Sequence, residues 1–195
     1  VACRRPDLAL FLQPLGNVGQ ISFVQANLRY PDSVKKAAEG SDHIVNCVGL
    51  LAKSGKNTFE AVQDKGAAVI AATAKAIGAK LTHVSAIGAD ASSASLYAST
   101  KGRAEKAVLE AVPDAVIIRP SVVFGPEDNF FNKFAAMAKT SPVLPLIGGG
   151  QTKFQPVYAG DVAEVIARSV DGKLKPGATY ELGGEDVLSF EDCLK

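Results

Sequence analysis

The sequence predicts an α/β protein built around a doubly wound parallel sheet. Short apolar segments alternate with segments of helical periodicity, which is the pattern of strands joined by crossover helices. Within the apolar segments, hydrophobic residues run almost continuously and do not alternate with polar ones. This continuity is typical of parallel strands that helices cover on both faces.

The first half of the chain supplies three of the expected strands. Residues 1–3 read as the end of a strand that Arg4, Arg5 and Pro6 terminate. Residues 21–25 and 43–48 are the next two apolar runs. Between them, Pro31 followed by Asp32 and Ser33 is typical of the first turn of a helix.

Two longer helices and two further strands follow. Apolar and small residues recur at helical spacing from Phe59 to Ile77, and Gly78 is a typical helix end. A strand is expected at residues 80–85 and another at 115–118. Between these two strands, a helix begins at Tyr97. Its expected buried face carries Ala104, Val108 and Ala111.

The pattern loosens after Pro126. Helices are expected at residues 129–140 and 161–170, separated by a segment rich in turn residues. We expect residues 1–125 to form one domain, and residues 126–195 to complete the sheet and add a small cap. The cap would lie over the carboxyl edge of the sheet, where ligands bind in such folds.

Composition excludes several classes of function. The 195 residues carry a net charge of +1, which gives no electrostatic footprint for nucleic acid or anionic lipid. No apolar run is long enough for a membrane span. Three distant cysteines and two histidines show no metal-ligand spacing, so we expect no metal site and reduced, buried thiols in a cytosolic or matrix-like compartment. The cysteines are Cys3, Cys47 and Cys193.

Ser85, Tyr97 and Lys101 form the candidate catalytic set. Tyr97 and Lys101 are four residues apart on one expected helix and therefore share a face. A lysine ammonium beside a phenol lowers its pKa, and a serine hydroxyl at a strand end can orient a carbonyl or an alcohol. The competing interpretation is that a tyrosine and a lysine share a solvated helix face by chance.

Four segments in the same order resemble the extended and atypical short-chain dehydrogenase/reductase superfamily, which includes the NAD-dependent epimerases and dehydratases. They are Ser85 with Tyr97-x-x-x-Lys101, then residues 119–126, 155–163 and 180–184. The last two segments are similar to the branch that contains the NADPH-binding accessory subunit of respiratory complex I and its alphaproteobacterial relatives. The resemblance implies a Rossmann-type fold that binds NAD(P)(H).

The resemblance assigns cofactor-binding roles to several residues besides Ser85, Tyr97 and Lys101. They are Arg4, Arg5, Asn27, Leu28, Val48, Gly49, Pro120, Val122 and Val123. An arginine at the first pair suits a 2′-phosphate, so NADP(H) is preferred, with NAD(H) as the alternative and Arg4 nearer the ribose. Each assignment has a plainer competitor, namely a solvated basic turn at Arg4 and Arg5, tight turns at Asn27 and Gly49, or apolar loop packing at Pro120, Val122 and Val123.

The strand, glycine-rich turn and helix that open this superfamily have no counterpart in the sequence. Gly16 and Gly19 precede a strand and so lie in the wrong context for a pyrophosphate-binding turn. We therefore expect this chain to be part of a longer protein, with a missing strand between those at residues 1–3 and 43–48. Ser189 and Asp192 resemble the opening of a further helix.

Two functions remain open from the sequence. In the first, the protein is an accessory subunit of NADH-ubiquinone oxidoreductase that holds NADPH mainly for stability. In the second, it is a free NADP-dependent oxidoreductase or sugar-nucleotide epimerase/dehydratase that uses Tyr97, Lys101 and Ser85. Residues 129–150 carry few cations, which favours the first. An RNA-binding relative is a remote third option. The expected location is cytoplasmic, or peripheral on the matrix or cytoplasmic face of a respiratory membrane.

Overall fold

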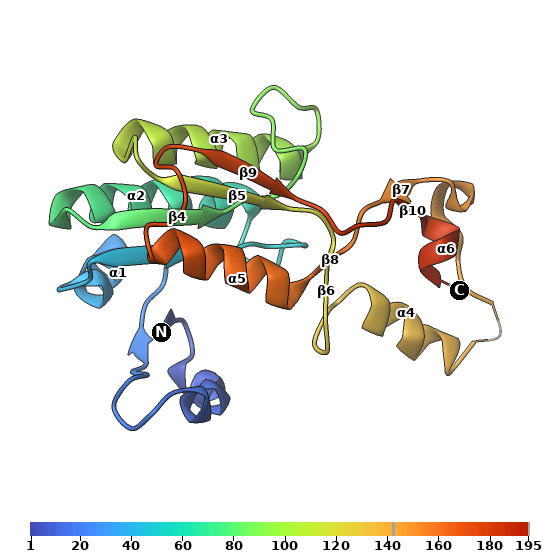
Figure 1. Ribbon diagram of the computed structural model, residues 1–195, viewed down its shortest axis with the longest axis horizontal. Helices are drawn as coiled ribbons and strands as arrows, with labels where there is room; N and C mark the ends of the chain where they lie inside the picture. The colour runs from blue at the N-terminus through green and yellow to red at the C-terminus, as the bar shows by residue number, and fades with distance from the viewer. Residues whose placement is uncertain (142, 195) are drawn as a thin grey trace.

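A four-stranded parallel sheet lies at the centre of the protein. The computed structural model describes residues 1–141 and 143–194. The sheet has the order β3-β4-β5-β9, with bounds His43–Asn46, Lys80–Val84, Val116–Pro120 and Thr179–Leu182. Helices α2 (Lys65–Ile77) and α3 (Leu96–Ala111) cover one face, and α5 (Ala159–Val170) lies on the opposite face (Figure 1). The predicted α/β class with a parallel sheet is confirmed.

The amino-terminal segment forms a separate two-stranded sheet. Strands β1 (Ala2–Cys3) and β2 (Val24–Gln25) pair in parallel, with the 3-10 helix η1 (Pro6–Leu15) between them in the chain. Helix α1 (Pro31–Ala38) leads from β2 to β3. In the described residues neither β1 nor β2 pairs with β3, and a cavity of about 570 Å³ lies between them. This interval is where the sequence analysis expects a further strand.

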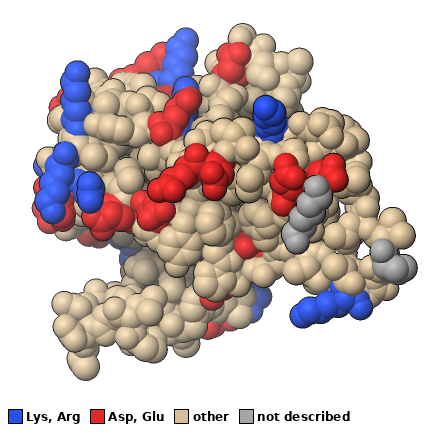
Figure 2. All heavy atoms as spheres, turned by 45° about the vertical axis from the view of Figure 1, so that its right-hand side comes forward, with Lys and Arg blue, Asp and Glu red and all other residues tan. Residues whose placement is uncertain are grey.

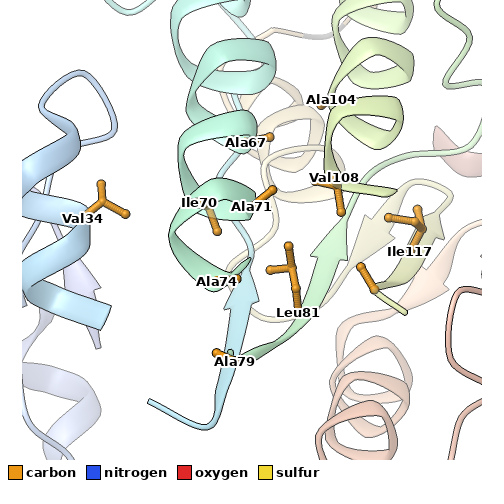
Figure 3. Close-up of a cluster of buried hydrophobic side chains, with 11 residues drawn as sticks. Val34, Ala67, Ile70, Ala71, Ala74, Ala79, Leu81, Ala104, Val108 and Ile117 are labelled. Atoms are coloured by element: carbon orange, nitrogen blue, oxygen red, sulfur yellow. The ribbon is translucent and has the colours of Figure 1, made fainter. Parts of the chain in front are cut away.

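Small residues let α2 and α3 pack closely on the sheet. Ala71, Ala74 and Ala104 are completely buried, and Figure 3 shows the side chains of α2 directed toward Leu81 on β4. Val108 is also fully buried, and Ala111 packs against the same cluster, so the buried face predicted for the Tyr97 helix is confirmed. Such close packing holds the helix carrying Tyr97 and Lys101 in a fixed position above the strands.

Local structure departs from the sequence prediction at two places. The strand predicted at residues 21–25 shortens to β2, and the ten-residue η1 was not predicted. The long helix ends before Gly78 as predicted, with φ of 71° at that glycine, but it opens with a π-helical turn, η2 (Glu60–Asp64). The π turn keeps the helical stripe of apolar residues almost unchanged, which is why the pattern did not reveal it.

The carboxyl-terminal part adds a cap beside the sheet. Strands β6 (Val123–Phe124) and β8 (Val157–Tyr158) pair in parallel and connect it to the sheet half (Figure 1). The cap itself contains α4 (Phe131–Ala138), η3 (Ile147–Gly150), the antiparallel pair β7 (Lys153–Phe154) and β10 (Leu188–Ser189), and α6 (Phe190–Leu194). The hydroxyl of Ser189 accepts the backbone N–H of Asp192 at 3.1 Å and so caps α6. A domain boundary at residue 125 stays a prediction.

Candidate functional site

Ser85 and Lys101 meet at the carboxyl end of β4. Lys101 is 5 % exposed, and its Nζ donates a hydrogen bond to the carbonyl of Val84 at 3.2 Å. The next residue, Ser85, is 4 % exposed, and its backbone N–H donates to the carbonyl of Ile118. Its Oγ has no hydrogen-bond partner among the described residues. The structure therefore brings the predicted lysine and serine together at one strand end.

Tyr97 completes this group from the first turn of α3. The hydroxyl of Ser95 caps the helix by accepting the backbone N–H of Ala98. The Tyr97 ring is half-buried and stands edge-on to Phe59, with 6.0 Å between the ring centroids. Tyr97 and Ser85 both line a cleft of about 1150 Å³. Lys101 is absent from the described lining of that cleft, and an added Cβ at Gly49 would be 3.6 Å from its Nζ.

Burial dominates the electrostatics of this group. It raises the pKa of Tyr97 above its ordinary value. Burial also lowers the pKa of Lys101, while the charges of Glu105 and Cys47 oppose that shift. The expectation that Lys101 lowers the pKa of the phenol is therefore wrong for this structure. The physical reason is that burial disfavours the charged phenolate, and burial is the cause of the shift.

A buried glutamine anchors the loop next to Lys101 and was missed from the sequence. Gln63 is 2 % exposed and lies in the π turn η2. Its Oε1 accepts the backbone N–H of Leu50 at 3.0 Å, and its Nε2 donates to the hydroxyl of Thr100 at 3.0 Å. Gln63 thus joins the Val48–Gly49 loop to α3. The sequence signal that could have indicated this role is that Gln63 is a polar residue next to Val62, which belongs to the apolar stripe of the helix.

A second buried pair holds the same loop from the sheet side. The Oδ1 of Asn46 accepts the backbone N–H of Val48 at 3.0 Å, and its Nδ2 is 2.9 Å from Nδ1 of His83. His83 is 1 % exposed, and burial followed by the charge of Lys101 lowers its pKa to about 4. A neutral imidazole is therefore part of the support of the site, and Asn46 is a positioning residue that the sequence analysis did not single out.

The adenine-side residues predicted from the resemblance gather around the smaller cavity. Arg4, Asn27, Leu28, Val48 and Gly49 all line it. The Oδ1 of Asn27 accepts the backbone N–H of Arg29 at 3.1 Å, so its turn role is present in the structure. The side chain of Leu28 packs against Gly66 of α2, where an added Cβ would be 2.7 Å from it.

Arg4 and Arg5 differ in their surroundings. Arg4 is exposed at the edge of the cavity, whereas Arg5 forms an exposed ion pair with Asp7 at 2.9 Å and is absent from the described lining. That carboxylate competes with any anion for Arg5. That Arg4 lies nearer the ribose than Arg5 stays a prediction.

The three predicted nicotinamide-loop residues line the larger cleft. Pro120 is buried, and its carbonyl accepts the backbone N–H of Ile87 at 3.1 Å. The carbonyl of Val122 accepts the backbone N–H of Val157 at 2.9 Å, and Val123 pairs with Val157 in β6 and β8. All three lie in the same lining as Ser85 and Tyr97. Their hydrogen bonds also show the structural packing role that competes with cofactor contact.

Four further features of the described residues concern metal-ligand groups, membrane-spanning helices, surface charge and cysteines. No group of three or more His, Cys, Asp or Glu is placed to hold a metal ion, and no helix is both long and apolar enough to cross a membrane. On the face shown in Figure 2, Lys and Arg lie as separate groups interrupted by Asp and Glu. The three cysteines are free, but the expectation that they are buried is wrong, because Cys47 is exposed and Cys3 and Cys193 are half-exposed.

The fold and the sequence motifs define a Rossmann-type protein of the extended short-chain dehydrogenase/reductase class. A family model described as the RmlD substrate binding domain matches residues 18–192, and the chain belongs to this family. The dTDP-4-dehydrorhamnose reductase of Bacillus anthracis, solved in complex with NADP, superposes with a TM-score of 0.75 at 16 % identity. That comparison covers 97 % of this chain and 76 % of the other, and it shows the shared fold.

Two relatives are similar in sequence. The Arabidopsis thaliana protein named NADH dehydrogenase [ubiquinone] 1 alpha subcomplex subunit 9, mitochondrial, is 38 % identical over 189 residues, which is 95 % of this chain and 47 % of the relative. A ceramide reductase of Caulobacter vibrioides is 33 % identical over 128 residues, or 66 % of this chain and 40 % of that protein. This chain spans about half the length, or less, of these two relatives.

Proposed function

We propose that this protein binds NADP(H) and serves as an accessory subunit of the NADH-ubiquinone oxidoreductase type, in which the nucleotide mainly stabilises the fold. The observation that carries the proposal is that residues assigned to the two halves of a dinucleotide line two cavities of the described chain. Arg4 and Asn27 line the smaller of these two, which also contains the interval where a further strand is expected, and Ser85 and Tyr97 line the larger. The similarity to the Arabidopsis complex I subunit supports the assignment to this type.

The residues present fit a nicotinamide dinucleotide. Gly49 has no side chain, so a ligand can approach its backbone closely. The buried Oγ of Ser85 is without a partner among the described residues. Buried polar atoms are rarely left unpaired unless a ligand or water completes them. We propose that Arg4, Asn27, Leu28, Val48 and Gly49 hold the adenosine half, and that Pro120, Val122 and Val123 face the nicotinamide half.

A preference for NADP(H) follows from Arg4. A guanidinium at the edge of the adenosine-side cavity can bind a 2′-phosphate with two parallel hydrogen bonds. Arg5 is held by Asp7 and would contribute less. Replacing Arg4 by Ala should weaken NADPH binding about tenfold or more and leave NADH binding nearly unchanged, as judged by competitive titration of the full-length protein. Equal losses for both nucleotides would reject the preference.

The second candidate function is carbonyl reduction by the same site. A bound reduced nicotinamide would supply the hydride. Tyr97, whose pKa burial raises, stays protonated at neutral pH and can donate its proton to a carbonyl oxygen, while Ser85 donates a hydrogen bond to that oxygen. Lys101 places its charge behind them. The position of Ser85 and Lys101 at one strand end, with Tyr97 in the same cleft lining as Ser85, favours this candidate. The similarity to a protein named as a reductase also favours it.

One experiment separates the two functions. The full-length protein is purified natively, and its retained nucleotide is identified by mass spectrometry. The variant Tyr97→Phe is then compared with Tyr30→Phe, which alters an exposed ring that is absent from the described lining of the cleft. For the accessory function, we expect retained NADPH and normal complex I assembly in both variants, with assembly lost when the protein is deleted. Assembly that survives deletion, with turnover lost in Tyr97→Phe alone, would favour the free enzyme.

We propose that the protein lies peripherally on the matrix or cytoplasmic face of a respiratory membrane.

A further inference from the structure

The cleft beside Tyr97 has walls made mainly of hydrocarbon. Aliphatic and aromatic side chains from the loops and from the cap line it: Leu51, Ile87, Val122, Val123, Phe124, Phe130, Phe154 and Val187. Several of them remain accessible, with Ile87 44 % exposed and Phe124 36 % exposed. A concave surface of partly exposed apolar side chains is typical of a site that buries an apolar ligand.

The aromatic wall is backed by further rings and does not collapse into the cleft. Phe130 lies 5.6 Å from Phe154 and 6.1 Å from the buried Phe190, measured between ring centroids. Phe124 is held from the other side by Phe131 at 5.9 Å and Tyr158 at 5.7 Å. The contacts of Phe130 with Phe190 and of Phe124 with Phe131 are edge-to-face and the other two are tilted, and such contacts stabilise the positions of the rings. The cleft of about 1150 Å³ therefore keeps an apolar wall of defined shape.

The charges of the cleft disfavour a phosphorylated ligand. Among the described residues that line it, Lys153 is the only cation, while Glu127 and Asp128 are acidic. The amino end of α4 could attract an anion, but the Oδ1 of Asp128 already accepts the backbone N–H groups of Phe130 at 2.8 Å and Asn132 at 3.1 Å. Sites for diphosphates instead present Arg, Lys or free backbone N–H groups.

The polar groups at the inner end of the cleft suit a single oxygen. The Oγ of Ser85 is buried and has no partner among the described residues, and the half-buried Tyr97 lines the same cleft. A buried hydroxyl without a partner is unfavourable relative to a satisfied one, so a ligand oxygen there would be stabilising. The rest of the described lining offers few uncharged polar side chains, and the amide of Gln155 is bound to the carbonyl of Gly184 at 2.6 Å.

We propose that this cleft binds an uncharged ligand that carries a carbonyl or hydroxyl oxygen at one end and a long hydrocarbon chain at the other. The oxygen lies at Ser85 and Tyr97, and the chain runs along Ile87, Phe124 and Phe130 toward the cap. The proposal rests on the proposed function, because the same Ser85 and Tyr97 face the nicotinamide half of the cofactor. It excludes nucleoside-diphosphate sugars as ligands of this cleft.

The test is a binding series with the full-length protein, carried out with and without NADPH. The probes are 2-hexanone, 2-nonanone and 2-dodecanone, titrated by calorimetry, with dTDP as the phosphorylated competitor. We expect affinity to rise about two- to fourfold for each added methylene group, and we expect dTDP neither to bind in the cleft nor to displace the ketone. Affinity that does not depend on chain length, or displacement by dTDP, would overturn the proposal.

A matched pair of variants locates the ligand. Ile87→Lys places a cation in the cleft wall, whereas Ile77→Lys makes the same change at the end of α2, outside the cleft and with a similar exposure of 40 %. We expect Ile87→Lys to weaken 2-dodecanone binding about tenfold and Ile77→Lys to leave it unchanged, with NADPH affinity preserved in both. Ketone binding equal in the two variants would refute the assigned position. If the full-length protein without any substitution did not bind NADPH, the proposed function would be refuted instead.

Discussion

The sheet half and the cap bury their apolar residues in different ways. In the sheet half, Ala71, Ala74 and Ala104 are fully buried, so that helix backbones lie close to the strands. In the cap, α4 has no buried residue among those described, and the packing comes from phenylalanine rings that meet at their edges. Phe190 at 4 % exposure is the buried centre of that ring cluster.

This contrast separates two tasks within one site. The sheet half fixes the side chains of Lys101, Asn46 and Gln63, because each is buried and hydrogen-bonded to the backbone of a nearby loop or strand end. Ser85 is held through its backbone N–H, which donates to the carbonyl of Ile118. The cap contributes side chains that are partly exposed and that form one wall of the cleft. Groups that hold a cofactor or move a proton need the fixed environment, whereas a wall that accepts a chain of variable length does not.

The largest expected effect comes from truncating one buried side chain in the core of the sheet half and, in a separate variant, one in the core of the cap. Leu81→Ala should lower the free energy of unfolding by about 2–5 kcal/mol and Phe190→Ala by a comparable amount of about 3–5 kcal/mol, since both side chains are nearly buried. Hydrogen exchange distinguishes them. We expect Leu81→Ala to deprotect β3, β4 and β5, and Phe190→Ala to deprotect α4 and α6 only. Deprotection of the whole chain by Phe190→Ala would show that the two halves unfold as one unit.

A second test measures how the free energy of unfolding depends on pH. The pKa of His83 is lowered from 6.5 to about 4, so the folded state prefers the neutral ring. Its stabilising contribution is complete above pH 6.5 and is lost as the pH falls toward 4, by about 3 kcal/mol at most. His83→Gln keeps an acceptor for Asn46 and should remove this part of the slope in urea denaturation. His43→Gln, at a half-buried histidine, should remove less. Equal slopes in the two variants would contradict the assignment.

The smallest expected effect concerns the loop beside Lys101. Gln63→Leu leaves the backbone N–H of Leu50 without its acceptor, which costs about 1–2 kcal/mol. We expect NADPH affinity of the full-length protein to fall about tenfold, while the variant remains folded. Gln20→Leu removes a glutamine whose Oε1 likewise accepts a backbone N–H, that of Asn17 at 2.8 Å, outside the described lining of both cavities. It serves as the control, with no change in NADPH affinity expected. An equal loss in the control would mean that the effect is not specific to the loop.

The sequence predicted most of the sheet half because its information is local. Continuous apolar runs marked β3, β4 and β5, and Gly78 marked the end of α2, where the backbone adopts a positive φ. Helix η1 and the π turn η2 escaped because neither changes the spacing of apolar residues much. The division of the cap into short elements also escaped, since its order depends on contacts between rings far apart in the sequence.

Part of the candidate site could also be predicted from local sequence patterns. Spacing placed Tyr97 and Lys101 on one helix face, and the end of a strand placed Ser85 nearby. The supporting residues Asn46 and Gln63 were missed because their partners lie 37 residues away in each case. The direction of the Tyr97 pKa shift was wrong because it depends on how deeply the ring is buried, which residue order does not reveal.

The side-chain amide of Asn46 also determines which ring nitrogen of His83, 37 residues further along the chain, carries the proton. Since its oxygen is bound to the N–H of Val48, its NH₂ group must face the imidazole, and Nδ1 of His83 must accept. The hydrogen of the neutral ring therefore resides on Nε2. Spontaneous deamidation of Asn46 would replace that donor with a carboxylate, which would favour a proton on Nδ1 of His83 in place of the present acceptor.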